Sequence, residues 1–252
     1  MPNRRSLLRI LVFLFVLMLG NSYRSHEALP SSTNVLTDAL TGSWHLKDAG
    51  TDQLLIIADN YIMHTIYSFD QKKFEMAKGG TYKLADGKLN VKVEFNSNDK
   101  SKAASNASHG YKIEGDQLTL ALGEKTHVFK RLDNGTAPLT GNWNITGRMQ
   151  DGKMGEIVPG DRKTIKLLSG TKFQWAAINT KTGEFFGTGG GSYSFENGKY
   201  TENIEFFSRD NSRVGASLSF DGALENGKWI HKGLSSKGDA IHEVWSRVHV
   251  AG

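Results

Sequence analysis

The sequence predicts an all-β protein made of two tandem eight-stranded antiparallel up-and-down barrels. Residues 53–123 align without a gap on residues 164–234 at a constant offset of 111, and self-similarity of this kind marks a repeated structural unit. Within each copy, apolar and polar residues alternate between Asp-Gly and Asn-Gly turn signals, as in short strands joined by hairpins. Neither copy has convincing helical periodicity. Eight hairpin-linked strands leave two exposed edges unless the sheet closes, so closure into barrels is expected.

The N-terminus is typical of an export signal. Met1–Arg9 is basic, Ile10–Leu19 is an unbroken run of ten apolar residues, and small residues follow, so we predict a signal peptide over residues 1–22. A transmembrane helix needs about 20 apolar residues, which disfavours the alternative of an uncleaved anchor. We expect a flexible tail over 23–38, no transmembrane segment after signal cleavage, and a periplasmic or extracellular protein.

Composition and charge exclude several functions. The formal net charge is +5, and without the three arginines of the first nine residues 28 basic side chains remain against 26 acidic ones. This balance argues against a nucleic-acid partner. The chain has no cysteine, which excludes disulfides, thiolate zinc sites and cysteine nucleophiles. We expect no metal and no cofactor. His64 shares the parity of the apolar residues Ile62 and Ile66, but no second His, Asp or Glu is spaced to join it on the same strand.

The first module is expected over residues 39–133. Leu89, Val91, Val93 and Phe95 alternate with polar residues, which predicts a strand whose apolar side chains face the interior. The same reasoning places strands at 40–47, 53–58, 61–69, 73–85, 88–96, 107–114, 117–122 and 126–132. We expect this module to be a degenerate binder or a scaffold.

The second module is expected over residues 138–249, after a turn-forming link. It carries twelve additional residues after Trp143, within 147–161. These either form a flexible lid or a surface loop without function. The glycine run 187–191 leads into a strand rather than a helix, so we interpret it as a bend at a barrel corner and not as a phosphate-binding loop.

Both modules begin with Gly-x-Trp and end with an arginine. The residues are Trp44 with Arg131, and Trp143 with Arg247. This pattern resembles the lipocalin and calycin signature, which implies that each arginine packs over its tryptophan at the closed end of the barrel, a contact worth about 1 kcal/mol. The whole chain also resembles tandem lipocalin-like secreted proteins of Gram-negative bacteria that have no assigned activity. The Thr-Asp-Tyr motif of lipocalins is absent.

A comparison of the two copies suggests a ligand site in the second barrel. Glu202 stands where the first copy has Val91, among aromatic residues of the same parity. A buried acid in an aromatic wall is typical of a small-molecule pocket. We therefore predict a non-catalytic protein that holds a small, mostly apolar ligand. The predicted ligand-binding residues are Phe173, Trp175, Tyr193, Tyr200, Glu202 and Phe206.

Three alternatives remain open from the sequence. Glu202 could lie in water near the barrel mouth or pair with a neighbouring Lys or Arg. It could instead serve an enzyme as a general acid or base, which requires a second polar group within hydrogen-bond reach. The protein could also be a structural or carbohydrate-contacting surface protein with filled barrels and an exposed aromatic patch.

Overall fold

The structure is a computed structural model that describes residues 39–158, 160–235 and 238–248. The predicted signal peptide and tail, residues 1–38, lie outside the described residues. Within the described ranges, no helix combines the length and the apolar character needed to cross a membrane. Both barrels belong to one compact unit of the chain.

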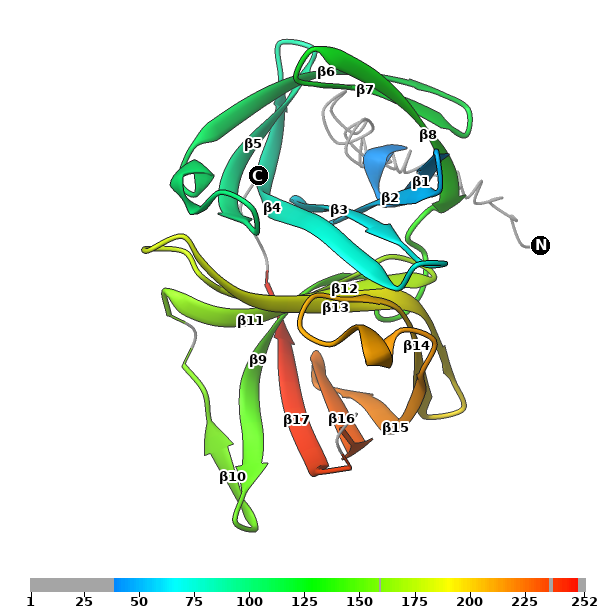
Figure 1. Cartoon of the computed structure of the whole chain (residues 1–252). Helices are drawn as coiled ribbons and strands as arrows, with labels where there is room; N and C mark the ends of the chain where they lie inside the picture. The colour runs from blue at the N-terminus through cyan, green and yellow to red at the C-terminus, as the bar shows by residue number, and fades with distance from the viewer. Residues whose placement is uncertain (1–38, 159, 236–237, 249–252) are drawn as a thin grey trace, which may run out of the picture. The chain divides into compact units, whose positions relative to one another are not determined.

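The first barrel is a closed sheet of eight antiparallel strands in sequence order (Figure 1). Its last strand pairs with its first, where Arg131 lies opposite Trp44. A short 3-10 helix, η1 (Lys100–Lys102), links the fifth and sixth strands. The strands are β1 (Gly42–Asp48), β2 (Thr51–Ala58), β3 (Tyr61–Ser68), β4 (Lys73–Ala85), β5 (Lys88–Asn96), β6 (Asn106–Glu114), β7 (Gln117–Leu122) and β8 (Lys125–Asp133).

The second barrel also has eight strands, closed by pairing of β17 with β9. The ring strands are β9 (Gly141–Gln150), β11 (Arg162–Leu168), β12 (Lys172–Asn179), β13 (Glu184–Glu196), β14 (Lys199–Phe207), β15 (Ser217–Glu225), β16 (Lys228–Leu234) and β17 (Ala240–Arg247). A 3-10 helix, η2 (Asn211–Arg213), matches η1. The additional residues after Trp143 extend β9 and form β10 (Lys153–Glu156), a hairpin partner of β9 outside the ring (Figure 1).

A β-bulge at the same place in each barrel redirects the strands. The register shifts between Gly79 and Gly80 in the first barrel and between Gly190 and Gly191 in the second. A Cβ atom at Gly80 would overlap the carbonyl oxygen of Lys92, so close backbone approach requires glycine there. The glycine run is thus a barrel corner that leads into strand.

Because of the bulge, Phe206 does not point into the second barrel, which is where the sequence predicted it to lie. Glu205 is an extra, unpaired residue of β14 opposite the glycines, so the side chains from Phe206 onward exchange faces. Phe206 therefore lies in a hydrophobic cluster shared by the two barrels and not in the interior of the second. Phe95 of the first barrel leaves its interior in the same way.

The shared cluster is the main contact between the barrels. Both barrels contribute buried apolar side chains to it. These include Leu54, Ile56, Tyr61, Met63, Tyr67 and Phe95 from the first barrel and Ile165, Leu167, Ile178 and Phe206 from the second. Within it, the hydroxyl of Thr65 donates to the side-chain oxygen of Gln174 at 2.8 Å. These two buried polar side chains thus satisfy each other across the interface between the barrels.

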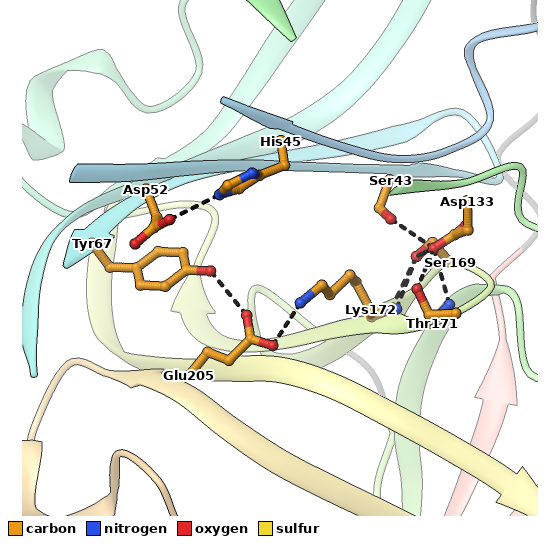
Figure 2. A network of polar contacts seen from close by, with 9 residues as sticks. All are labelled: Ser43, His45, Asp52, Tyr67, Asp133, Ser169, Thr171, Lys172 and Glu205. Carbon is orange, nitrogen blue, oxygen red and sulfur yellow. Dashed lines mark hydrogen bonds and ion pairs between the residues drawn. The ribbon is translucent and has the colours of Figure 1, made fainter. Parts of the chain in front are cut away.

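Polar groups also join the two barrels outside the hydrophobic cluster. Figure 2 shows Glu205 accepting from the Tyr67 hydroxyl at 2.9 Å and pairing with Lys172. It also shows the carboxylate of Asp133, at the end of β8, receiving hydrogen bonds from Ser43 of its own barrel and from Ser169 and Thr171 of the second. The end of the first barrel is thereby tied to the β11–β12 turn.

The two Trp–Arg pairs differ. The guanidinium carbon of Arg131 lies 3.8 Å from the ring centre of Trp44, as the lipocalin resemblance implies. Arg247 lies opposite Trp143 in the strand register, but its guanidinium makes two hydrogen bonds of 2.7 Å to Asp59, in the β2–β3 turn of the first barrel. Arg247 thus links the two barrels through Asp59, whereas the resemblance implied only a contact with Trp143 in its own barrel.

Substituting Asp133→Asn should destabilise the protein. Burial by itself raises the pKa of Asp133, but hydrogen bonds from Ser43, Gly170 and Thr171 outweigh it and hold the pKa below its ordinary value. The resulting stability is present above the unfolded-state pKa of about 3.9 and is lost as pH falls through the lower folded-state pKa. Losing the charged acceptor should cost about 2 kcal/mol.

Thermal unfolding between pH 7 and pH 3 tests this. The melting temperature of the variant should be roughly 5 °C below that of the unsubstituted protein at pH 7. This difference in melting temperature should become smaller toward pH 3. The exposed turn residue Asp86 provides a matched control, because Asp86→Asn should change little. Equal melting of the two variants at pH 7 would contradict the role of Asp133.

Candidate functional site

The interior of the second barrel contains a cavity of about 590 Å³, within the usual range for small-molecule sites. One part of its wall is apolar and largely aromatic, and the other is polar and charged. The apolar residues include Trp175, Ile204, Phe207, Leu218, Phe220 and Trp245. The polar residues include Arg148, Lys166, Glu202, His231 and Glu243.

A buried ion pair crosses this interior from β11 to β14. The ammonium of Lys166 lies 2.8 Å from a carboxylate oxygen of Glu202, and the two residues are only 4% and 5% exposed. The Tyr200 hydroxyl donates to the same oxygen at 2.9 Å. The hydroxyl bond and the pair together offset the desolvation of both charges. Glu202 is therefore buried and not exposed to water at the barrel mouth. It pairs with a lysine, which is one of the alternatives that the sequence left open.

Aromatic rings surround the ammonium of this pair. Its nitrogen lies 5.0 Å from the ring centre of Trp245, 5.1 Å from that of Trp229 and 5.3 Å from that of Tyr200. A cation within about 6 Å of an aromatic face is attracted to the ring quadrupole. The rings thus stabilise the charged form of Lys166 in addition to its ion pair with Glu202.

A second polar cluster lies between β16 and β17. Glu243 accepts hydrogen bonds from Arg148 at 2.7 Å and from the indole of Trp245 at 3.2 Å. His231 is 2% exposed, and its Nδ1 lies 3.6 Å from the Glu243 carboxylate, too far for a hydrogen bond. Neither ring nitrogen of His231 has a hydrogen-bond partner among the described residues.

The electrostatics of the cluster leave His231 uncharged. Burial lowers the pKa of its imidazole, so the ring is neutral at pH 7 with one donor and one acceptor nitrogen. Burial alone would raise the pKa of Glu243, but the nearby positive charges of Lys166 and Arg148 favour its ionised form and hold the pKa below its ordinary value. A buried neutral imidazole beside a cavity can hydrogen-bond a polar group on a bound molecule.

The structure separates the predicted ligand-binding residues into three groups. Trp175 and Glu202 line the cavity. Phe173, Tyr193 and Tyr200 belong to the packed core of the same barrel, where the Tyr193 hydroxyl donates to the carbonyl of Ser169. Phe206 lies in the cluster between the barrels. Trp143 packs in the barrel core, 6.0 Å from Trp229 between ring centres.

Sequence reasoning missed Lys166, His231 and Glu243. The signal for two of them was present, because the same offset that matches Glu202 with Val91 matches Lys166 with Leu55 and His231 with Leu120. The additional residues after Trp143, left open between a lid and a surface loop, are only partly related to the site. Arg148 of the β9 extension lines the cavity, whereas Met154 on β10 and Val158 after it are exposed.

His64 of the first barrel is also buried. Its Nε2 lies 3.0 Å from the side-chain oxygen of Gln53, and its ring meets that of Phe129 edge-on. Across the described residues, no group of three or more His, Cys, Asp or Glu side chains is placed to hold a metal ion.

Comparisons with known proteins identify no family for this chain. No protein-family model matches it, and no curated protein matches it. It is similar to an uncharacterized protein from Bacteroides eggerthii DSM 20697, with a TM-score of 0.31 and 13% identity over 43% of this chain and 98% of the other.

Weaker likenesses are to the Helicobacter pylori beta clamp bound to a DNA ligase peptide and to a Bacillus subtilis DNA polymerase sliding clamp. For the first, the TM-score is 0.17 and the identity 8%, over 88% of this chain and 66% of the other. For the second, the TM-score is 0.16 and the identity 7%, over 89% of this chain and 60% of the other. Likenesses at these scores carry no argument about function.

Replacing Lys166 and Glu202 by their counterparts in the first barrel should show that the two charges contribute jointly to the free energy of unfolding. Lys166→Leu alone leaves a buried carboxylate without its cation and should cost about 3 kcal/mol of unfolding free energy. Adding Glu202→Val restores the apolar pair of the first barrel, so the double variant should recover to within about 1 kcal/mol.

Urea denaturation followed by circular dichroism measures this cycle. The exposed pair Lys199–Asp221 provides the control, because Lys199→Leu removes only a solvent-exposed ion pair and should leave the free energy of unfolding nearly unchanged. Additive losses in the double variant would show that the two buried charges are not coupled.

Proposed function

We propose that the second barrel is a non-catalytic binding module for a small, mostly apolar ligand with an uncharged polar end. The observation that carries this proposal is the cavity of about 590 Å³, whose lining combines aromatic side chains with a buried His231 that has no hydrogen-bond partner among the described residues. The N-terminal segment supports a further proposal, that the protein acts in the periplasm or outside the cell.

Charge pairing inside the cavity favours an uncharged ligand. Lys166 is paired with Glu202, and Arg148 with Glu243. An anionic ligand would have to compete for Lys166 or Arg148, at the cost of leaving Glu202 or Glu243 buried and alone. Asp239, the lining acid without an ion pair among the described residues, is exposed and offers a cationic ligand only a weak contact. A hydroxyl or carbonyl group can instead bond the imidazole of His231 without disturbing either pair.

The aromatic wall supplies most of the expected affinity. Trp175, Phe207, Phe220 and Trp245 present flat apolar surface, and burying apolar area contributes about 25 cal/mol per Å². Such rings give affinity without requiring one ligand shape, whereas the imidazole fixes the orientation of the polar end.

The geometry supports binding over the two alternatives from the sequence. Lys166 and Tyr200 supply the second polar group that general acid-base catalysis by Glu202 would need. Both are engaged with the same carboxylate oxygen in a buried pair, which favours a role in holding the interior together. A barrel filled by side chains, as a purely structural role would suggest, would lack a cavity of this volume.

Tryptophan fluorescence can test the proposal with uncharged amphiphiles such as 1-decanol, geraniol and retinol. At least one should change the emission of the protein saturably. His231→Leu, which introduces the residue of the first barrel, should weaken that binding roughly tenfold by removing one buried hydrogen bond.

His242→Leu is the matched control, because His242 lies on the neighbouring strand β17, opposite Lys232, and does not line the cavity. It should leave the affinity unchanged. The proposal fails if no compound of the panel alters the emission, or if the two histidine variants bind equally well.

A further inference from the structure

The first barrel contains a cavity of its own, of about 240 Å³. Its apolar wall includes Leu55, Ile62, Leu89, Val91, Val93 and Leu120. Two lysines and two histidines line it as well, namely Lys78, Lys102, His64 and His109, and its lining contains no Asp or Glu. We propose that the first barrel binds a second and different ligand, a small aliphatic monocarboxylate whose charged end is held by Lys78.

Lys78 is placed to hold an anion. It lies on β4, directly opposite His64 of β3 and Asn96 of β5, so the three side chains share one face of the sheet. Burial lowers the pKa of its ammonium. Within the part of the chain that the structure describes, no carboxylate lies within ion-pair distance of it, in contrast to both cavity cations of the second barrel.

Lys78 is only partly exposed, so its unpaired ammonium carries a desolvation cost that no carboxylate offsets. A carboxylate entering the cavity would remove that cost, because opposite charges attract more strongly where water is partly excluded. Lys102 of η1 is exposed and lines the same cavity, so a second positive charge would attract an anion toward the site.

His64 offers the second polar contact. It is 5% exposed, and its Nδ1 has no hydrogen-bond partner while its Nε2 faces Gln53. Burial lowers its pKa to about 3, so the ring is neutral. A 180° rotation of the Gln53 amide exchanges its oxygen and nitrogen, which allows Nδ1 to carry the proton and donate to a carboxylate.

Comparison of the copies shows why the two cavities should select different charges. The position of Lys78 is Gly189 in the second barrel, where a Cβ would meet Trp175 and Phe207. Conversely, the ion pair of the second barrel is replaced by Leu55 and Val91 in the first. The cavity of the first barrel thus contains a lysine without a carboxylate partner, whereas each basic side chain that lines the cavity of the second barrel is paired with a glutamate.

Isothermal titration of the full chain with octanoate, 1-octanol and octylammonium tests the proposal. Octanoate should bind one site, at least tenfold more tightly than 1-octanol, and octylammonium should not bind there. Lys78→Met keeps the aliphatic stem and should lower octanoate affinity at least tenfold, whereas Lys78→Arg should stay within about threefold. The control Lys92→Met, exposed on β5, should not change it.

His231→Leu separates this proposal from the one for the second barrel. Octanoate binding should survive that substitution, whatever happens to uncharged ligands. Equal affinity for octanoate and 1-octanol, no effect of Lys78→Met in a protein that keeps its melting temperature, or loss of octanoate binding in His231→Leu would each overturn the assignment.

Discussion

The buried ion pair between Lys166 and Glu202 determines what the interior of the second barrel can contain. An eight-stranded barrel has room either for side chains or for one small ligand, and two charges inside it must be paired and hydrogen-bonded. The Tyr200 hydroxyl and the surrounding rings meet that requirement. The pair therefore leaves the rest of the cavity to aromatic side chains and to His231, and this division into an apolar wall and a polar wall is the basis of the proposed selectivity.

The contact between the barrels depends on a backbone feature that both copies share. The bulge after the glycine pairs carries Phe95 and Phe206 out of their barrels and into the common cluster. It also places a glutamate of each copy at the interface. Glu94 accepts from Tyr61 and pairs with Lys163, and Glu205 accepts from Tyr67 and pairs with Lys172. Each bulge thus gives up one interior position and contributes one apolar and one acidic side chain to the interface.

The two copies have kept one backbone and changed its interior. The same inward positions hold Leu55, Val91 and Leu120 in the first barrel and Lys166, Glu202 and His231 in the second. Such exchanges alter the cavities without altering strand order, because inward side chains do not take part in the ladder hydrogen bonds. Each barrel is therefore a structural reference for the other, and differences between them indicate chemistry more directly than either sequence does alone.

The sequence by itself determined the repeat, the strands and the closure, because alternation and turn residues are local and occur twice in this chain. It also indicated a buried acid at Glu202. Only the tertiary structure decided which residues meet across a barrel, as Lys166 meets Glu202, and which leave it, as Phe206 does. A bulge inverts the alternation from which direction is inferred. The partner of Arg247 is Asp59 of the other barrel, and a pairing so distant in sequence depends on docking, which has no local pattern.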